Sequence, residues 1–124
     1  MTREEKDLLF QDLCVRLPYG VMVNVKGFDF DFNSKLVQIY KGSRMGCSFE
    51  VTNGMPYDID EIKPYLYPLS SMNEEQKKEW LYTLSSDYNI TYDTIDWLNK
   101  NHFDYRGLIE KSLALDATNL RTYE

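Results

Sequence analysis

The sequence contains few of the residues that most enzymes and metal proteins use for chemistry. Its 124 residues include two cysteines, Cys14 and Cys47, and one histidine, His102. Neither cysteine belongs to a CxxC pair, so no disulfide framework or redox motif is indicated. One histidine and two distant cysteines are also too few soft ligands for a structural zinc site. We therefore expect neither zinc nor another cofactor.

Basic residues and long apolar runs are scarce as well. Lysine and arginine number 14 against 20 aspartates and glutamates, which gives a formal net charge of −6. This balance disfavours a broad nucleic-acid surface, because phosphate contacts need clustered cations, and it permits an acidic face aimed at a basic partner. No apolar run is long enough to span a membrane. The beginning MTREEKDLLF lacks the pattern of a signal peptide, so we expect a cytoplasmic protein.

The composition is otherwise that of a globular protein. Hydrophobic residues make up 43% of the chain and charged residues 27%, which argues against disorder. A chain of this length can bury its own core, so we expect one domain over residues 1–124. The periodicities predict a helix over 3–17, a β-meander over 21–59, a connector over 60–72, a helical part over 73–115 and a loose tail over 116–124.

The first helix has clear start and stop signals. Thr2 with Glu5 fits a capping box, in which each side chain bonds to the backbone of the other residue. Asp12 and Arg16 are spaced to pair on the outer side of this helix. Pro18 then ends it, because proline disfavours helical geometry in the residue before it.

Three helices are expected in the C-terminal part. Ser71 with Glu74 forms a second capping box, which opens a helix over about 73–85. A short helix over about 94–101 follows, and Asp104 is placed to cap a third helix. In that third helix an apolar stripe recurs at i, i+3, i+4 and i+8, formed by Tyr105, Leu108, Ile109 and Leu113.

Residues 21–59 alternate between apolar and polar side chains. The alternation runs from Val21 to Val25, from Phe28 to Phe32 and through two later segments, as in half-buried strands. Asn53 and Gly54 form the strongest hairpin signal, because both tolerate the positive φ of a type I′ turn. Short strands with one apolar face are best buried by curling together. We therefore expect an α+β fold: an N-terminal helix, a small antiparallel, partly open barrel of the SH3-like kind, and a C-terminal cluster of three helices.

The connector is rich in tyrosine. Its segment KPYLYP places Tyr65 and Tyr67 between prolines, with Tyr57 shortly before it, and we expect the connector tyrosines to lie across the barrel mouth. A tyrosine ring offers rigid, amphipathic contact area at low entropic cost. Tyr57, Tyr65 and Tyr67 are therefore candidate contacts to another protein.

A hairpin near residue 43 suggests a different surface. Lys35, Lys41 and Arg44 place cations around it, and neighbouring aromatic rings could stack on bases. The segment GSRMG lacks the GK[ST] ending of a phosphate loop, so a turn explains it better. Lys41 and Arg44 are candidate contacts to single-stranded nucleic acid, although the net charge disfavours this partner.

One acidic segment resembles the opening of a calcium loop. In the range 29–33 oxygen-bearing side chains stand at the first, third and fifth positions, as such loops require. The match then fails, because Ser34 replaces the required glycine and Tyr40 the closing glutamate. The acidic solvent face of an amphipathic strand is the favoured interpretation.

A second acidic cluster contains Asp58, Asp60 and Glu61. Paired carboxylates can serve as general acid and base when one of them is desolvated. Such an enzyme would require Asp31, Asp58 or Asp60 to meet in one cleft. The weak metal candidates in the two acidic segments are Asp29, Asp31, Asp58 and Asp60.

His102 allows two interpretations. It could act as a base for Cys47 or Ser48 if the fold brought them together, but the segment GCSFE matches no nucleophile signature. More often such a histidine fixes a junction between helices by bonding a carbonyl or capping a C-terminus. We favour the structural interpretation.

Three segments carry a resemblance to one protein family: RLPYGV at Arg16 to Val21, IKPYLYPLSSM at Ile62 to Met72, and DWLNKNHFDYRGLIEKSLAL at Asp96 to Leu115. They are similar to segments of short uncharacterised proteins of gut bacteria, of the Bacteroidetes type, often encoded near phage or mobile-element genes. The resemblance implies a bacterial cytoplasmic origin. It implies no activity, cofactor or partner, so it assigns no role to any residue.

Together these observations favour a non-enzymatic module that binds another protein through an acidic, tyrosine-rich surface around the barrel and the connector. The alternative is a nucleic-acid-binding accessory module that uses the small barrel and its basic hairpin. A carboxylate-dependent enzyme or metal-binding protein ranks third, because every catalytic template matches poorly.

Overall fold

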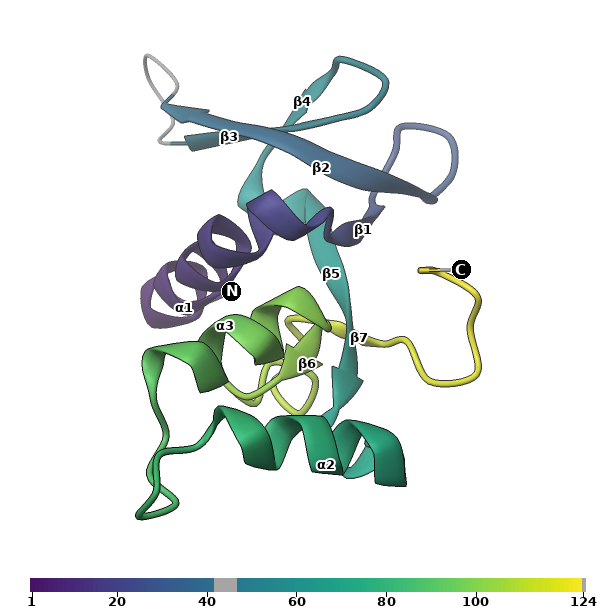
Figure 1. The fold of residues 1–124 in the computed structure, drawn as a ribbon. Coiled ribbons are helices and arrows are strands. Elements are labelled where there is room, and N and C mark those ends of the chain that lie inside the picture. The colour runs from purple at the N-terminus through teal and green to yellow at the C-terminus, as the bar shows by residue number, and fades with distance from the viewer. Residues whose placement is uncertain (42–46, 124) are drawn as a thin grey trace.

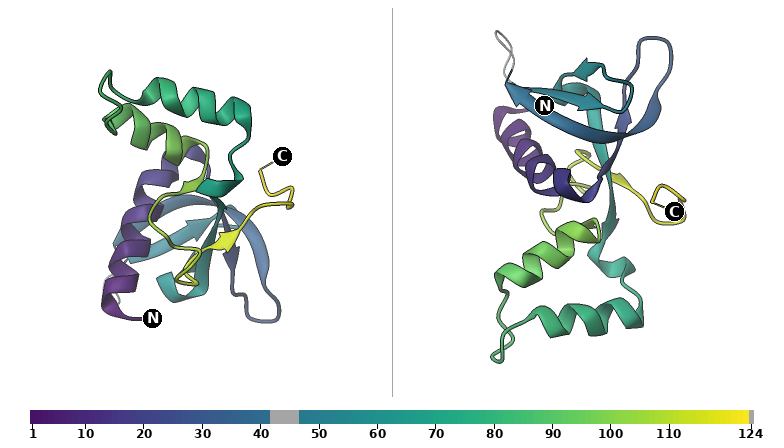
Figure 2. Two further views of the ribbon diagram at one scale, coloured as in Figure 1. Left: turned by 90° about the horizontal axis from the view of Figure 1, so that it is seen from below. Right: turned by 45° about the horizontal axis from the view of Figure 1, so that its top comes forward.

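The computed structural model describes residues 1–41 and 47–123 (Figure 1). Two further views show the helices α2 and α3 side by side beyond one end of the sheet, with α1 along the sheet (Figure 2). The elements in chain order are α1 (Arg3–Arg16), η1 (Leu17–Tyr19), β1 (Met22–Val25), β2 (Phe32–Lys41), β3 (Cys47–Val51), β4 (Pro56–Tyr57), η2 (Ile59–Glu61), β5 (Ile62–Pro68), η3 (Leu69–Ser71), α2 (Glu74–Thr83), α3 (Tyr92–Lys100), β6 (Phe103–Asp104) and β7 (Leu115–Asp116).

The sheet is open and mixed. Its strand order is β4-β3-β2-β1-β5-β6, and β7 also pairs with β5. The first five strands are antiparallel neighbours, whereas β6 and β7 run parallel to β5. The predicted α+β class is confirmed, with an N-terminal helix, this sheet and two further helices. No closed barrel is present among the described strands.

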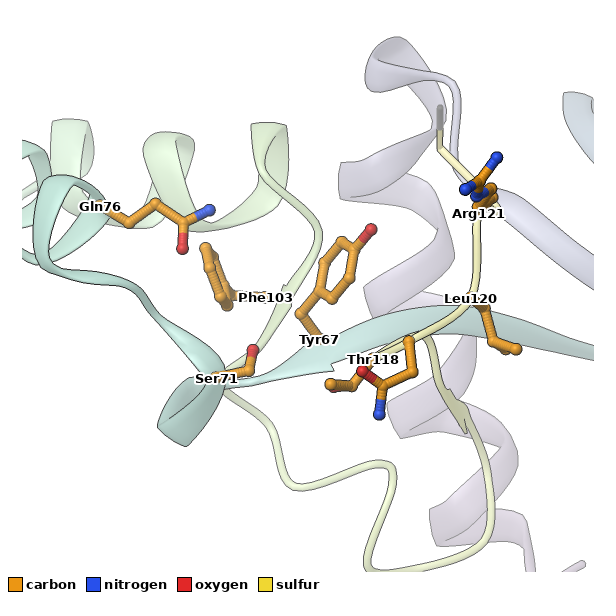
Figure 3. A pocket seen from close by; sticks show the side chains of 8 residues that line it. Tyr67, Ser71, Gln76, Phe103, Thr118, Leu120 and Arg121 are labelled. Carbon is orange, nitrogen blue, oxygen red and sulfur yellow. The ribbon is translucent and has the colours of Figure 1, made fainter.

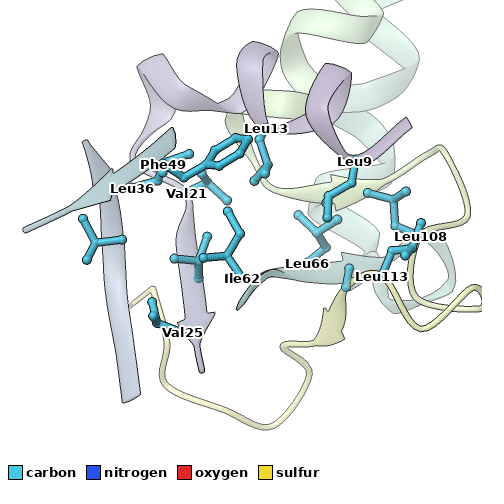
Figure 4. Packing of buried hydrophobic residues seen from close by; sticks show 13 residues of the cluster. Leu9, Leu13, Val21, Val25, Leu36, Phe49, Ile62, Leu66, Leu108 and Leu113 are labelled. Carbon is cyan, nitrogen blue, oxygen red and sulfur yellow. The ribbon is translucent and has the colours of Figure 1, made fainter. Parts of the chain in front are cut away.

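The core lies between α1 and the sheet. Leu9 and Leu13 of α1 are fully buried and point towards Ile62 and Leu66 of β5 (Figure 4). Burial of such a side chain contributes about 1.5–3 kcal/mol. The predicted cap of α1 is confirmed: the Glu5 N–H donates to Thr2 Oγ1 at 3.1 Å, and the Thr2 N–H donates to Glu5 Oε1 at 2.8 Å.

The predicted connector over 60–72 is wrong for most of its length, because it contains β5. This strand pairs with β1, with Pro64 opposite Val23, and also with β6 and β7. Burial does not alternate along this strand, since the three consecutive residues Pro64 to Leu66 are all buried, so it lacks the period of two that marks a half-buried strand. Its two prolines obscured the strand, since proline is uncommon inside a sheet.

The second alternating segment does not form a strand. Residues 28–31 are a loop between β1 and β2, and β2 begins only at Phe32. Phe28 and Phe30 are 103% and 72% exposed. Alternation alone therefore misled the prediction, because no neighbouring element covers the apolar face of this segment.

The third predicted helix is also wrong. Residues 105–114 form turns, in which Gly107 and Ser112 have φ values of +72° and +60° that no helix contains. The Asp104 carboxylate accepts hydrogen bonds from the N–H groups of Leu108 and Ile109, both at 2.9 Å. The side chain thus acts as a cap, as predicted, but it caps a turn. Leu108 and Leu113 are buried, as the predicted apolar stripe requires, although the backbone that carries them is not helical.

The opening of α2 differs by two residues from the prediction. Asn73 is the N-cap, and its capping-box partner is Gln76, with hydrogen bonds of 2.7 and 2.9 Å. Ser71 lies in η3 instead, where its hydroxyl donates to the Pro68 carbonyl at 2.7 Å. Either pair fits the same sequence rule, so periodicity alone could not choose between them.

The C-terminal segment, expected to be loose because it lacks periodicity, is attached at Tyr123. The Tyr123 hydroxyl accepts from the Met22 N–H at 3.1 Å and donates to the Tyr65 carbonyl at 2.6 Å. Ala117 is buried as well. Within the described residues, no helix has the length and hydrophobicity needed to cross a membrane.

Candidate functional site

Large exposed apolar side chains follow one another along the chain from the end of α2 to the start of α3. Among them the exposed fraction ranges from 50% to 90%. We call this group the α2–α3 turn surface; it comprises Leu81, Tyr82, Tyr88, Ile90 and Tyr92. Neither the connector nor the predicted barrel contributes to it.

Hydrogen bonds hold this turn in a defined shape. The hydroxyl groups of Thr91 and Thr94 both donate to the Thr83 carbonyl, at 2.8 and 3.0 Å, and so join the end of α2 to the start of α3. The Tyr88 N–H donates to the Ser85 carbonyl at 2.8 Å. Tyr88 has a φ of +61°, which is unusual for a bulky residue and places it in a tight turn.

A recess of about 280 Å³ lies between the end of α1 and α3. We call it the Tyr19 recess; its lining is Val15, Pro18, Tyr19, Tyr92, Ile95, Asp96 and Asn99. The Tyr19 hydroxyl donates a short hydrogen bond to Asp96 Oδ1. This bond and the carboxylate charge raise the pKa of Tyr19 above its usual value, so the phenol stays protonated. Tyr92 belongs both to this recess and to the α2–α3 turn surface.

A second cavity, of about 390 Å³, lies beside the start of α2 (Figure 3). The Tyr67 ring contacts Phe103 and Tyr123, with ring centroids 6.1 and 5.9 Å apart. The remaining lining residues are Ser71, Gln76, Thr118, Asn119, Leu120 and Arg121. The Ser71 hydroxyl is already bonded to the backbone. The lining of this cavity is therefore mixed, with two aromatic rings on one side and polar side chains from α2 and the C-terminal segment on the other.

A fully buried ion pair joins α1 to residues 103–106. Arg16 Nε donates to Asp12 Oδ2 at 2.8 Å, and the Arg16 guanidinium also donates to the Phe103 carbonyl at 2.6 Å. Arg106 donates to the other Asp12 oxygen at 3.0 Å. We expected Asp12 and Arg16 on the outer side of α1, but both side chains are 0% exposed. The i,i+4 spacing predicted that Asp12 and Arg16 would pair. It could not predict their burial, because residues 103–106, which pack over the pair, are distant in the sequence.

His102 follows Asn101, the C-cap of α3, and has a φ of +62°. Its N–H donates to the Asn99 carbonyl at 3.1 Å, and its carbonyl accepts from the Tyr67 N–H at 2.8 Å. The imidazole stacks on the Tyr123 ring with centroids 3.8 Å apart, and its buried Nδ1 has no hydrogen-bond partner among the described atoms. Burial first, and the Arg16 charge second, lower the pKa of His102 to about 4.

The predicted tyrosine site is divided between different environments. Tyr57 is half-buried on β4, where its ring packs edge-on against Phe32 with the ring centroids 6.0 Å apart. Tyr65 is only 7% exposed, and its hydroxyl donates to Asn33 at 2.7 Å, so it supports the fold. Tyr67 lines the cavity of Figure 3. Lys41 is the last residue of β2, and Arg44 lies outside the described residues.

The predicted carboxylates are all exposed. Asp31 and Asp60 line one depression of about 610 Å³, together with Lys26 and Lys63. Asp60 also approaches Lys6 at 3.5 Å. The other two lie elsewhere in the chain, Asp29 in the β1–β2 loop and Asp58 at the N-cap of η2. Across the described part of the chain, no group of three or more potential ligands is placed to hold a metal ion.

Comparisons with family models, with curated proteins and with solved structures give no match to this chain. The α2–α3 turn surface was missed by the sequence argument, which placed the tyrosine-rich surface at the connector. The available signal was the segment 82–92, which holds three of the ten tyrosines between short polar residues.

Proposed function

We propose that this protein is a non-enzymatic interaction module that binds another protein through the α2–α3 turn surface. The observation that carries the proposal is the exposure of this surface: Tyr82 is 90% exposed, Tyr88 78% and Tyr92 84%. Exposed apolar patches of this kind mark interaction sites in soluble proteins. The hydrogen bonds around Thr83 support the proposal, because a preorganised turn loses little entropy on binding.

The contact area is sufficient for a specific interface. A tyrosine side chain can bury about 150–250 Å². Three such rings supply most of the roughly 800 Å² that each partner buries in an interface of standard size. Leu81 and Ile90, at 50% and 65% exposure, add apolar area around them.

The charge of this region favours a basic partner. Residues 73–100 contain six aspartates and glutamates and three lysines, so their formal charge is −3. Acidic side chains around an apolar centre raise the association rate of a cationic protein and repel nucleic acid. A basic protein is therefore the partner class that this surface fits.

We also propose that β1 to β5 form the partly open, SH3-like barrel expected from the sequence. The antiparallel order β4-β3-β2-β1-β5, the one-turn helix η2 directly before β5 and the contact between β3 and η2 support this. An experimental structure in which β4 and β5 diverge, with no shared core between them, would remove this part of the proposal.

The functional test is capture by the tagged full chain from a gut-bacterial extract, the source that the resemblance implies, with and without nuclease. The test variant combines Tyr82→Ser with Tyr88→Asn, since asparagine tolerates positive φ. The matched control combines Phe28→Ser with Phe30→Ser, which removes exposed rings in another loop. Circular dichroism checks that each variant is folded.

We expect to capture one protein in stoichiometric amount, with and without nuclease. The control variant should capture the same amount, and the test variant should capture at least about tenfold less. Equal capture by both variants would remove the α2–α3 turn surface from the proposal. Nuclease-sensitive recovery would instead favour the nucleic-acid alternative.

A further inference from the structure

We infer that the Tyr19 recess receives an arginine side chain of this basic partner. The inference rests on the proposed function and identifies the chemistry of one contact. The recess combines a carboxylate, two phenol rings and an apolar wall within about 280 Å³. Small-molecule sites usually measure about 300–1,000 Å³, so this volume suits one inserted side chain better than a cofactor.

The carboxylate in the recess is oriented, and among the described residues it has no cationic partner. The Tyr19 hydroxyl donates to Asp96 Oδ1, which holds the carboxylate in place and leaves its other oxygen able to accept. Over residues 1–41 and 47–123, no lysine or arginine forms an ion pair with Asp96. An incoming guanidinium would therefore complete a charge pair without breaking one.

The rest of the lining matches the other parts of an arginine side chain. Val15, Pro18 and Ile95 offer apolar surface for its methylene groups. The rings of Tyr19 and Tyr92 offer faces for a guanidinium, which is planar, weakly hydrated and stacks on aromatic rings. A lysine ammonium is more strongly hydrated and gains less from these rings.

The position of the recess makes the contact compatible with the α2–α3 turn surface. Tyr92 is common to both, so a partner covering the turn surface reaches the recess without a gap. Asp93 lies three residues before Asp96 on α3, which makes the two carboxylates neighbours along the helix. An exposed carboxylate at Asp93 would attract the cation before it enters.

The test is a titration of the ¹⁵N-labelled full chain with the peptide acetyl-Leu-Arg-Leu-amide, followed by amide chemical shifts. The matched peptide replaces arginine with citrulline, which has nearly the same shape and no charge. A third peptide carries lysine. The protein variant is Asp96→Asn, whose side-chain oxygen still accepts the Tyr19 hydrogen bond, and Asp29→Asn removes one equal charge from a different loop.

We expect the arginine peptide to shift the amides of Ile95, Asp96 and Asn99. The apparent affinity should fall by about tenfold with citrulline or with Asp96→Asn, because either change removes one member of the charge pair, and it should be unchanged with Asp29→Asn. Shifts elsewhere, or equal binding of the citrulline peptide, would overturn the inference. Equal binding of the lysine peptide would overturn the assignment to arginine.

The capture experiment separates this inference from the proposed function. If the Tyr82 and Tyr88 variant loses the partner and Asp96→Asn retains it at full strength, the function stands and the arginine contact is wrong. If both variants lose the partner, both are supported. If neither loses it, the proposed function fails, and the peptide titration alone cannot restore it.

Discussion

His102 shows how one buried side chain can give the whole protein a dependence on pH. Its imidazole stacks on the Tyr123 ring and lies near the Arg16 guanidinium. Arg16 pairs with the Asp12 carboxylate. Protonation of the imidazole would bury a positive charge and place it near the positive charge of Arg16. The folded protein therefore holds the imidazole neutral, and the folding free energy depends on that proton.

We predict that stability falls as the pH is lowered from 6.5 towards 4. The pKa of His102 is about 4 in the folded protein against 6.5 ordinarily. Between these values the unfolded chain binds more protons, so the free energy of unfolding decreases with decreasing pH. The loss by pH 4.5 is up to about 3 kcal/mol, measured by urea unfolding. The control is His102→Asn, because asparagine tolerates the φ of +62°; equal pH dependence in both proteins would contradict the prediction.

At the scale of elements, local sequence signals identified capping residues more reliably than they showed whether a helix follows the cap. The box of Thr2 with Glu5 is confirmed, because both of its hydrogen bonds are present. Asp104 shows why the rule fails elsewhere: its carboxylate caps the N–H groups that follow, but Gly107 then adopts a positive φ. The apolar residues of this segment reach the core through turns and not through a helix. A stripe of apolar residues reports burial, and the backbone that achieves it depends on tertiary contacts.

The junction of α2 with α3 should loosen when its hydroxyl groups are removed. Thr91→Val with Thr94→Val keeps the shape of both side chains but removes two hydrogen bonds to the Thr83 carbonyl and the cap of α3. We predict a local loss of about 3 kcal/mol, from about 1 kcal/mol for each of the two bonds and about 1 kcal/mol for the cap. Native-state hydrogen exchange should accelerate for amides of α3 and not for those of β1 and β5. Thr2→Val, which removes the cap of α1, should accelerate α1 instead; unchanged exchange in α3 would contradict the prediction.

At the scale of the whole molecule, the sequence predicted the composition of the fold and not its connections. The first helix and the strand after it follow from periods of 3.6 and 2, since these periods are local. The same periods failed for residues 28–31, which form a loop, and for Asp12 and Arg16, which are buried. The pairing of β5 with β1, β6 and β7 joins residues far apart in the chain and leaves no local pattern. The Tyr19 recess has the same origin, because it forms only where the end of α1 and η1 meet α3. The α2–α3 turn surface is instead local, within residues 81–92. Tyrosine content could indicate a binding surface but not its location.

Tyr123 is the clearest of these long-range connections, because it joins the C-terminal segment to two strands. Its hydroxyl bonds to the backbone of both β1 and β5, so Tyr123→Phe leaves the Met22 N–H and the Tyr65 carbonyl without this partner while the ring can still stack on His102. An unsatisfied buried polar group costs about 1–3 kcal/mol. We predict that the free energy of unfolding in urea falls by about 2–3 kcal/mol with an unchanged m-value, because β1, β5 and the C-terminal segment unfold together. Tyr88→Phe, which removes a hydroxyl from an exposed ring, should change it by less than about 0.5 kcal/mol. Equal stability of the two variants, or a separate early transition in Tyr123→Phe, would show that the C-terminal segment is not part of the cooperative unit.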